Sequence, residues 1–332
     1  MTELLHNASN PITASIQRAE LAGRAAVCKV ISGTRASVHP DWHAAPDPPA
    51  WNWWQREDRL LAHGLPPAWG PAGLRLPRLL QREVWANGDI ALWLEAMDGR
   101  HGPSLTLADH LDLCRRLGRA QGVAVPSAAW HSRGFLRDHC GSKHVDPAWL
   151  RSDAAWAEPL VRDGWPPGLR AGLERLHARR EVLFAAAEAA PRGFCHLDLW
   201  AYNAFAVDGG FVLLDGGCAG DGALGEDVCN LVAEAGLDGL VAADQVPALG
   251  EACFAAYVDG LRAVGWDGDA AAVRRGFCAS AVKFHWLGPL HLERAVTGVH
   301  HRYGGARDAS PAGQYRRRGA TLAWLVGLAD AV

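Results

Sequence analysis

The most restrictive feature of the chain is a polar loop that runs from His196 to Asn203 and is followed at once by a short hairpin. Two runs of β-forming residues flank the turn Asp208-Gly209-Gly210, and the second run ends at Asp215. A two-stranded hairpin returns the chain to the point from which it left. The fold must therefore place Asp215 beside the loop that carries Asp198 and Asn203.

The spacing of these polar residues indicates a particular chemistry. His196, Asp198 and Asn203 match the pattern H-x-D-L-x-x-x-N, which forms the catalytic loop of kinases. Phosphoryl transfer needs positioning and charge neutralisation more than covalent help from the protein. We expect Asp198 to accept the proton of an acceptor hydroxyl, or at least to orient it. Asn203 and Asp215 are expected to hold Mg²⁺, which prefers hard oxygen ligands, and His196 to hydrogen-bond the backbone of the metal-binding loop.

The N-terminal part supplies two further candidates. Alternating β-forming residues between 11 and 36 predict an antiparallel hairpin whose second strand carries Lys29. The segment Val27-Cys28-Lys29 resembles the strand that presents a lysine to nucleotide phosphates. Residues 51–64 have apolar side chains at helical spacing and a terminal glycine, which predicts a helix carrying Glu57. We expect Glu57 to pair with Lys29, although solvent-facing positions for both remain alternatives.

The remaining pattern divides the chain into a β-rich part and a helical part. Strands are expected over residues 79–85 and 90–94, and the polar segment after them suits a hinge near residue 97. Apolar residues recur at helical spacing from Leu105 onward. Further helices are expected over residues 167–190, 224–234, 245–264, 270–287 and 315–331.

The run from Gly193 to Ala233 resembles the aminoglycoside phosphotransferase and choline kinase superfamily, and Leu92 to Glu95 resembles its hinge. The resemblance implies a bilobal, protein-kinase-like α+β fold. The small β-rich N-lobe would cover residues 1–97 and the larger α-rich C-lobe residues 98–332. The resemblance also implies a nucleoside triphosphate, ATP or GTP, as phosphoryl donor, with Glu95 at the nucleotide-binding hinge.

The acceptor side is marked by three candidates. His285 and Trp286 lie where the resembling family builds its acceptor pocket, and Asp227 belongs to the acidic cluster that follows the hairpin. Asp227 could instead be a helix N-terminal charge or an anchor for the catalytic loop, and the other two could be ordinary core residues. The expected acceptor is a small hydroxylated molecule, first an aminoglycoside or another hydroxylated antibiotic, then a sugar, nucleoside or amino alcohol.

A second class of function stays open, a catalytically silent kinase-fold regulator that binds a nucleotide or metabolite. The segment expected to cover the nucleotide, residues 5–16, contains no glycine, whereas protein kinases use glycines there. An α/β hydrolase is a remote third reading, because the chain has no G-x-S-x-G elbow.

Composition excludes several partners. The formal net charge is −3, with 36 acidic and 33 basic residues, so we expect no nucleic-acid partner. No apolar run approaches the length of a membrane span, and no signal peptide is evident, which predicts a cytoplasmic protein without a membrane partner. The eight cysteines include no C-x-x-C pair and are expected to be buried, reduced thiols. The sequence does not indicate an oligomeric state.

Overall fold

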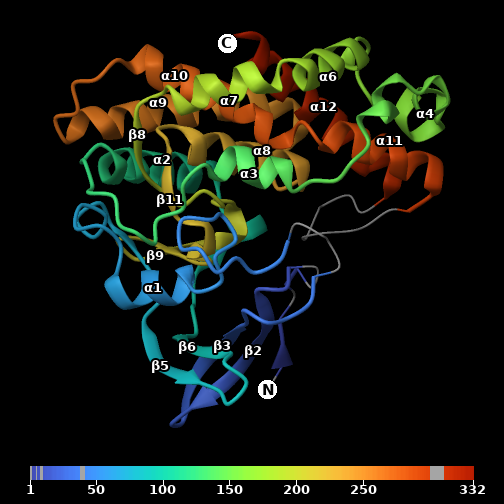
Figure 1. The fold of residues 1–332 in the computed structure, drawn as a ribbon. Coiled ribbons are helices and arrows are strands. Elements are labelled where there is room, and N and C mark those ends of the chain that lie inside the picture. The colour runs from blue at the N-terminus through green and yellow to red at the C-terminus, as the bar shows by residue number, and fades with distance from the viewer. Residues whose placement is uncertain (1, 5, 8–9, 38–41, 300–309) are drawn as a thin grey trace.

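The chain folds into two lobes, one built on a sheet and one made mainly of helices (Figure 1). The computed structural model describes residues 2–4, 6–7, 10–37, 42–299 and 310–332. The expected α+β architecture, with a small β-rich N-lobe and a larger α-rich C-lobe, is confirmed. Part of the glycine-free segment expected to cover the nucleotide, residues 5, 8 and 9, lies outside the described residues.

The N-lobe sheet has the strand order β1-β2-β3-β6-β5, and neighbouring strands are antiparallel. Its strands are β1 (Thr2–Glu3), β2 (Thr13–Leu21), β3 (Arg24–Ile31), β5 (Leu79–Val84) and β6 (Ile90–Glu95). Ala22 and Gly23 form the turn between β2 and β3 with φ angles of 50° and 76°, as a tight two-residue hairpin turn requires. Lys29 is paired with Ile16 on one side and Leu92 on the other. The lysine therefore lies on a central strand, not on an edge strand.

Helix α1 (Arg56–His63) lies between the N-lobe sheet and the C-lobe (Figure 1). The helix ends before Gly64 as expected, but it begins at residue 56, not 51. Residues 51–55 form turns because Arg56 draws the backbone carbonyls of Ala50 and Trp51 toward its guanidinium. A side-chain interaction of this kind leaves no trace in hydrophobic periodicity.

The C-lobe contains the longer helices and several short strands. Its α-helices are α2 (Leu107–Gln121), α3 (Phe135–Gly141), α4 (Asp153–Ala157), α5 (Pro159–Arg162), α6 (Leu169–Ala178), α7 (Arg180–Glu188), α8 (Glu226–Leu237), α9 (Val246–Ala263), α10 (Ala270–Ala279), α11 (Leu287–Thr297) and α12 (Pro311–Asp330). The strands are β4 (Leu74–Arg75), β7 (Arg100–His101), β8 (Arg192–Cys195), β9 (Ala204–Val207), β10 (Gly210–Leu213) and β11 (Gly220–Ala223). Short 3₁₀ turns include η1 (Gly102–Ser104), η2 (Pro147–Arg151), η3 (Ala201–Asn203), η4 (Gly216–Cys218), η5 (Ala243–Gln245) and η6 (Ser280–Phe284).

Two of the expected long helices are interrupted. The helix predicted over residues 167–190 is divided into α6 and α7 at Arg179, whose backbone (φ −90°, ψ 5°) departs from helical geometry. The helix predicted over residues 270–287 gives way to the tighter turn η6 at Ser280, whose hydroxyl donates to the carbonyl of Gly276. Such back-bonding to the preceding turn competes with regular helix geometry.

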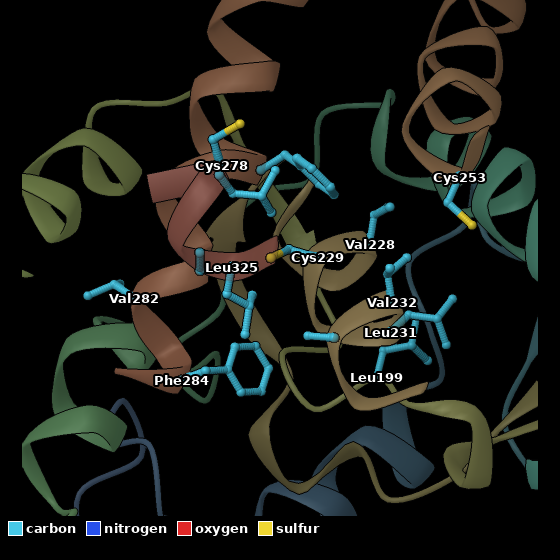
Figure 2. Close-up of a cluster of buried hydrophobic side chains, with 14 of the residues drawn as sticks. Leu199, Val228, Cys229, Leu231, Val232, Cys253, Cys278, Val282, Phe284 and Leu325 are labelled. Atoms are coloured by element: carbon cyan, nitrogen blue, oxygen red, sulfur yellow. The ribbon is translucent and has the colours of Figure 1, made fainter. Parts of the chain in front are cut away.

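Helix α8 is the centre of the C-lobe core. Figure 2 shows its Val228, Leu231 and Val232 in a buried cluster with Phe284 and Leu325, which come from η6 and α12. Every residue of α8 except Glu234 is buried, as expected of a helix enclosed on all sides. Because Leu199 belongs to the same core, α8 gives the catalytic loop a rigid base.

The chain does not separate cleanly between the lobes at one residue. Strand β4 precedes the expected boundary but pairs with β10 of the C-lobe, and Trp69 belongs to the large buried core that includes α8. Strand β7 follows the boundary and pairs with β9. The division at residue 97 stays a prediction.

The cysteines behave as expected. All eight are free, and all except the partly buried Cys218 are buried. Within the described ranges, no helix combines the length and apolar character needed to cross a membrane.

Candidate active site

The hairpin of β9 and β10 brings Asp215 back to the polar loop. The two strands pair from Val207 with Gly210 to Ala204 with Leu213. The register is then extended by the N–H of Leu214, which donates to the carbonyl of Asn203 at 2.8 Å. Asp215 thus follows directly on the residue that is bonded to Asn203.

His196 has the role that its position predicted. Its Nε2 lies 2.8 Å from the carbonyl oxygen of Leu214, to which it can donate. This bond joins the start of the catalytic loop to the residue before Asp215. The predicted hydrogen bond from His196 to the backbone next to Asp215 is confirmed.

Asp227 anchors the loop that runs from His196 to Asn203. Its two carboxylate oxygens accept from the N–H groups of His196 at 2.8 Å and Leu197 at 2.7 Å, and one of them also accepts from Gln121 at 2.8 Å. The side chain has no solvent exposure. Both oxygens are used inside the protein, as the alternative interpretation of Asp227 as an anchor for the loop predicts, and a contact with the acceptor stays a prediction.

Two further buried side chains hold this loop and were missed in the sequence. The amide of Asn230 donates to the carbonyl of Leu199 at 2.7 Å. The ammonium of Lys283 donates to the carbonyl of Leu197 at 3.0 Å. Leu197 has a φ of 67°, an unfavourable conformation for a side chain of its size. Strain of this kind persists only where surrounding contacts impose it.

Asp198 and Asn203 lie at the open end of the loop. The side chain of Asp198 is 43% exposed, and its Oδ1 lies 3.7 Å from the ammonium of Lys283. The amide nitrogen of Asn203 donates to the backbone carbonyl of Asp198 at 2.9 Å. This bond leaves the side-chain oxygen of Asn203 as the atom that can bind a cation.

Lys29 joins the two lobes through carboxylates on either side. Its ammonium lies 2.5 Å from Glu57 Oε2 and 2.8 Å from Asp215 Oδ1, which is 186 positions away in the sequence. Lys29 and Glu57 are buried, whereas the Asp215 side chain is 47% exposed. The structure therefore brings together the three residues that the sequence had linked only by their order.

The pKa values of this trio follow from burial and charge. Burial alone would lower the pKa of Lys29. The negative charges of Asp215 and Glu57 outweigh burial and raise this pKa above its ordinary value, so the lysine stays charged. Burial would raise the pKa of Asp215, but the ammonium of Lys29 outweighs it and lowers that pKa. Burial raises the pKa of Glu57 despite the opposing charge of Lys29. Asp215 thus remains ionised and available as a cation ligand.

Helix α1, which carries Glu57, is fixed to the C-lobe by Arg56. This fully buried guanidinium donates to five backbone carbonyls, those of Pro48, Ala50, Trp51, Trp130 and Gly217. The last of these lies two residues after Asp215. Arg56 therefore sets the position of α1 relative to the metal-binding loop, and nothing in the local pattern around it predicted this role.

Glu95 lies at the end of β6, and its carboxylate contacts groups of the same lobe. Its side chain binds the guanidinium of Arg75 at 2.5 Å and accepts from the N–H of Arg78 at 2.9 Å. These contacts lower the pKa of Glu95 although partial burial opposes them. The side chain secures the connection before β5, and its part in nucleotide binding stays a prediction.

His285 and Trp286 differ in their surroundings. The ring of His285 stacks on His177 of α6 at 5.6 Å, and its Nδ1 lies 2.9 Å from the carbonyl of Val282. Burial lowers the pKa of His285 to about 4. The prediction that His285 contacts the acceptor is not supported, because its ring faces α6 and α7. Trp286 donates from Nε1 to the backbone carbonyl of Lys283 at 2.9 Å, and the side chain of Lys283 in turn lies 3.7 Å from Asp198.

The donors at the end of the hairpin suit a hard cation. Asn203 offers an amide oxygen and Asp215 a carboxylate that remains ionised next to Lys29. Mg²⁺ commonly takes one or two protein oxygens and completes its shell with water and phosphate oxygens. The residues present therefore fit Mg²⁺ in the presence of a nucleotide.

Comparisons with known proteins come from structure. No family model and no curated protein sequence match the chain. Among solved structures, it is similar to the aminoglycoside phosphotransferase APH(4)-Ia, with 12% identity and a TM-score of 0.46 over 99% of this chain and 91% of that one. The chain is also similar to the aminoglycoside phosphotransferase APH(3'')-Id from Streptomyces rimosus, in complex with ADP and streptomycin. The identity is 17% and the TM-score 0.46 over 85% of this chain and 91% of that one. A third similar structure is the amicoumacin kinase hAmiN in complex with AMP-PNP, Ca²⁺ and Ami, with 13% identity and a TM-score of 0.47 over 92% of this chain and 87% of that one. At this distance, the substrate of the present chain has to be argued from its own site.

Proposed function

We propose that this chain is a small-molecule phosphotransferase that moves the γ-phosphoryl group of a nucleoside triphosphate, ATP or GTP, to a hydroxyl group. One observation carries the proposal: Lys29 of the N-lobe meets Asp215 of the C-lobe at 2.8 Å, directly after the hairpin that begins at Asn203. A cation for phosphates thus meets one of the two proposed metal ligands, and the amide of the second, Asn203, is bonded to the backbone of the exposed Asp198. Phosphoryl transfer requires this combination.

Each side chain has a distinct role in this proposal. Lys29, oriented by Glu57, binds phosphate oxygens of the donor. Asn203 and Asp215 hold Mg²⁺, which when bound neutralises charge on the phosphates. Asp198 orients the acceptor hydroxyl and takes up its proton as the new bond to phosphorus forms. The ammonium of Lys283 lies 3.7 Å from Asp198 Oδ1, so it places a positive charge beside this carboxylate.

The acceptor in this proposal is a small hydroxylated molecule. The motif resemblance puts an aminoglycoside or another hydroxylated antibiotic first, with a sugar, nucleoside or amino alcohol as alternatives. Asp198 is 43% exposed, so a hydroxyl can approach it. A silent nucleotide-binding regulator would need no such exposed carboxylate.

The test is release of nucleoside diphosphate in a coupled assay with Mg²⁺ and a panel of aminoglycosides, other hydroxylated antibiotics, sugars, nucleosides and amino alcohols. At least one acceptor is expected to stimulate release. Asp198→Ala should lower kcat by about 10²–10⁴-fold, which is the usual contribution of a general base, while the affinity for the nucleotide stays within a few-fold. A silent regulator would show no stimulation and no response to this substitution.

A further inference from the structure

Lys283 places a buried positive charge beside Asp198. It comes from η6, is 5% exposed, and lies with its ammonium 3.7 Å from Asp198 Oδ1 and 5.1 Å above the ring of Phe135. Its contact with Asp198 is its one ion pair within the part of the chain that the structure describes. The ammonium also donates to the carbonyl of Leu197 at 3.0 Å, so its charge is held beside the carboxylate that we propose orients the acceptor hydroxyl.

A second lysine, Lys143, extends this positive region. Its ammonium lies 4.1 Å from the ring centroid of Trp42 and 5.1 Å from that of Trp286. Trp286 also donates to the backbone of Lys283, so the two lysines are connected through one indole. Among the described residues, no carboxylate forms an ion pair with Lys143. Two aromatic rings and two lysines therefore form one cluster, in which the ammonium of Lys283 lies 3.7 Å from Asp198.

The nearby acidic residues do not cancel this charge. Glu234 of α8 interacts electrostatically with Asp198 and Lys283, and Asp238, directly after α8, interacts with Glu234 and with Arg317 and Arg318 of α12. Burial, followed by repulsion from Asp238, raises the pKa of Glu234 to about 8, so this carboxyl is largely protonated at neutral pH. A protonated Glu234 adds no negative charge beside Asp198 and Lys283.

We propose that Lys143 and Lys283, with the rings of Trp42 and Trp286, form the acceptor-binding wall of this site, and that the acceptor carries an acidic group, a carboxylate or a phosphate, near the hydroxyl that is phosphorylated. This inference rests on the proposed phosphotransferase function. Two lysines attract an anionic group by charge-assisted hydrogen bonds, and indole rings pack against a sugar or other ring. A polycationic aminoglycoside would bring several ammonium groups against charges of the same sign, so this inference ranks acidic hydroxylated acceptors ahead of the aminoglycosides that the motif resemblance favours.

A panel with one carbon skeleton separates these classes. Glucose, gluconate, glucose 6-phosphate and glucosamine supply a neutral, a carboxylate, a phosphate and an amine form, and kanamycin supplies a polycation. The proposal expects kcat/KM for gluconate or glucose 6-phosphate to exceed that for glucosamine and kanamycin by at least about tenfold. The better of the two acidic probes identifies the anionic group. Equal or better turnover of the polycation overturns the proposal while leaving the phosphotransferase function intact.

A pair of variants tests the role of Lys143 itself. Lys143→Met keeps an apolar side chain between the indoles but removes the charge, and should raise KM for the acidic acceptor about tenfold with KM for the nucleotide unchanged. Lys143→Arg keeps the charge and should restore KM to within a few-fold. A rise in the nucleotide KM instead would assign Lys143 to the phosphoryl donor and overturn the proposal.

The pH dependence provides a second readout of the same pair. Burial and the nearby charge of Lys283 lower the pKa of Lys143 to about 8, against the opposing effect of Asp198. The neighbouring thiols of Cys140 and Cys218 titrate far higher, because burial raises the pKa of each to about 12. KM for the acidic acceptor should therefore rise between pH 7 and pH 9 in the parent protein and stay nearly constant in Lys143→Arg. The same rise in both proteins contradicts the assignment.

The two proposals fail in different ways. Loss of the phosphotransferase function would appear as absence of nucleoside diphosphate release with every acceptor of the panel, whether or not the nucleotide binds. Failure of the acceptor inference would appear with nucleotide binding intact, as a preference for cationic acceptors or indifference to the Lys143 substitutions.

Discussion

At the scale of single residues, the catalytic loop is shaped by buried polar side chains whose partners are backbone groups. Asp227 accepts from two successive N–H groups, Lys283 and Asn230 donate to carbonyls of the same loop, and His196 connects it to Leu214. A buried polar group without a partner is costly, so each contact restricts the loop to one conformation. The loop is therefore formed before any ligand binds.

Asp227 offers a direct test of this dependence. Asn in its place supplies one accepting oxygen for two N–H groups and turns an amino group toward one of them. Asp227→Asn should lower the free energy of unfolding by roughly 3 kcal/mol and reduce kcat without a matching change in nucleotide affinity. Urea denaturation and steady-state kinetics measure the two effects. Asp221→Asn is the control, since Asp221 is 39% exposed and pairs with Arg192 at the surface; equal losses in the two variants would contradict the account.

The sequence predicted the residues with a motif and missed those without one. Asp198, Asn203 and Asp215 stand in a fixed spacing, and Lys29 and Glu57 lie on a strand and helix that periodicity indicates. Lys283 reaches Leu197 across 86 positions and Asn230 reaches Leu199 across 31. Their partners are backbone atoms, which no residue pattern specifies, so only the folded chain reveals them. Asp227 was ambiguous for the same reason.

At the scale of elements, the position of α1 decides whether Glu57 meets Lys29. Arg56 holds the start of the helix to the carbonyl of Gly217, and Leu60, one turn later, lies against Gly216. A Cβ at position 216 would come within 2.2 Å of Leu60 Cδ2. Glycine therefore lets the helix pack closely on the loop that begins at Asp215.

Gly216→Ala should displace α1 and weaken the Lys29–Glu57 pair. Because Leu60 is fully buried and has little space to move, we expect a loss of about 1–3 kcal/mol in the free energy of unfolding, as for overpacked cores, and weaker nucleotide binding. Thermal denaturation and calorimetric titration with nucleotide measure these effects. Gly217→Ala is the matched control, since its Cβ would meet nothing nearer than 3.7 Å. Similar behaviour of both variants would show that close packing of α1 is not required.

Elements with long periodic patterns were predicted well, and short ones were not. Helices α9 and α12 and strands β5 and β6 lie within a few residues of their expected bounds. The short helices α4 and α5 have five and four residues, too few for periodicity to register. The break between α6 and α7 occurs inside a continuous helical pattern at Arg179, where tertiary packing overrides local preference.

At the scale of the whole molecule, buried ionisable groups give the fold a defined pH dependence. Burial raises the pKa of Glu226 to about 7 and that of Asp238 to about 6. The folded protein then holds protons that the unfolded chain has released, so stability is lost as pH rises through these values. Burial lowers the pKa of His285 to about 4 and also lowers that of His139, so stability is lost as pH falls below the ordinary histidine value. The two opposing effects overlap between about pH 4 and pH 6.5, and above pH 6.5 only the loss from the buried carboxyls remains.

Glu226→Gln isolates the alkaline side of this profile. The glutamine oxygen can still accept from the N–H of Ala223, but no carboxyl remains to ionise. Between pH 6.5 and pH 8, the parent protein should lose roughly 1 kcal/mol more stability than this variant. Denaturant unfolding at the two pH values measures the difference. The control Glu20→Gln, at an exposed position of β2, should leave the slope unchanged, and a variant with the parent slope would contradict the role of Glu226.

The two lobes act as one unit because a lysine of one contacts a carboxylate of the other. The interaction of Lys29 with Asp215 and Glu57 connects β3, the end of β10 and α1. A divalent cation at Asp215 and Asn203 would therefore lie next to Lys29, which we propose binds the phosphates. Nucleotide binding should depend jointly on the metal and on Asp215, although the two parts of the chain are far apart in sequence.

The most direct measurement is calorimetric titration of AMP-PNP, with and without Mg²⁺, into the parent protein, Asp215→Ala and Asp198→Ala. The account predicts that Mg²⁺ strengthens AMP-PNP binding both in the parent protein and in Asp198→Ala. The two factors by which Mg²⁺ lowers Kd should agree to within about threefold. In Asp215→Ala the Mg²⁺-dependent part should be weakened at least about tenfold, the loss of one charged ligand being worth 1.4 kcal/mol or more. Unchanged Mg²⁺-dependent binding in Asp215→Ala would contradict the central claim that this carboxylate, returned by the hairpin, holds the metal of a phosphoryl-transfer site.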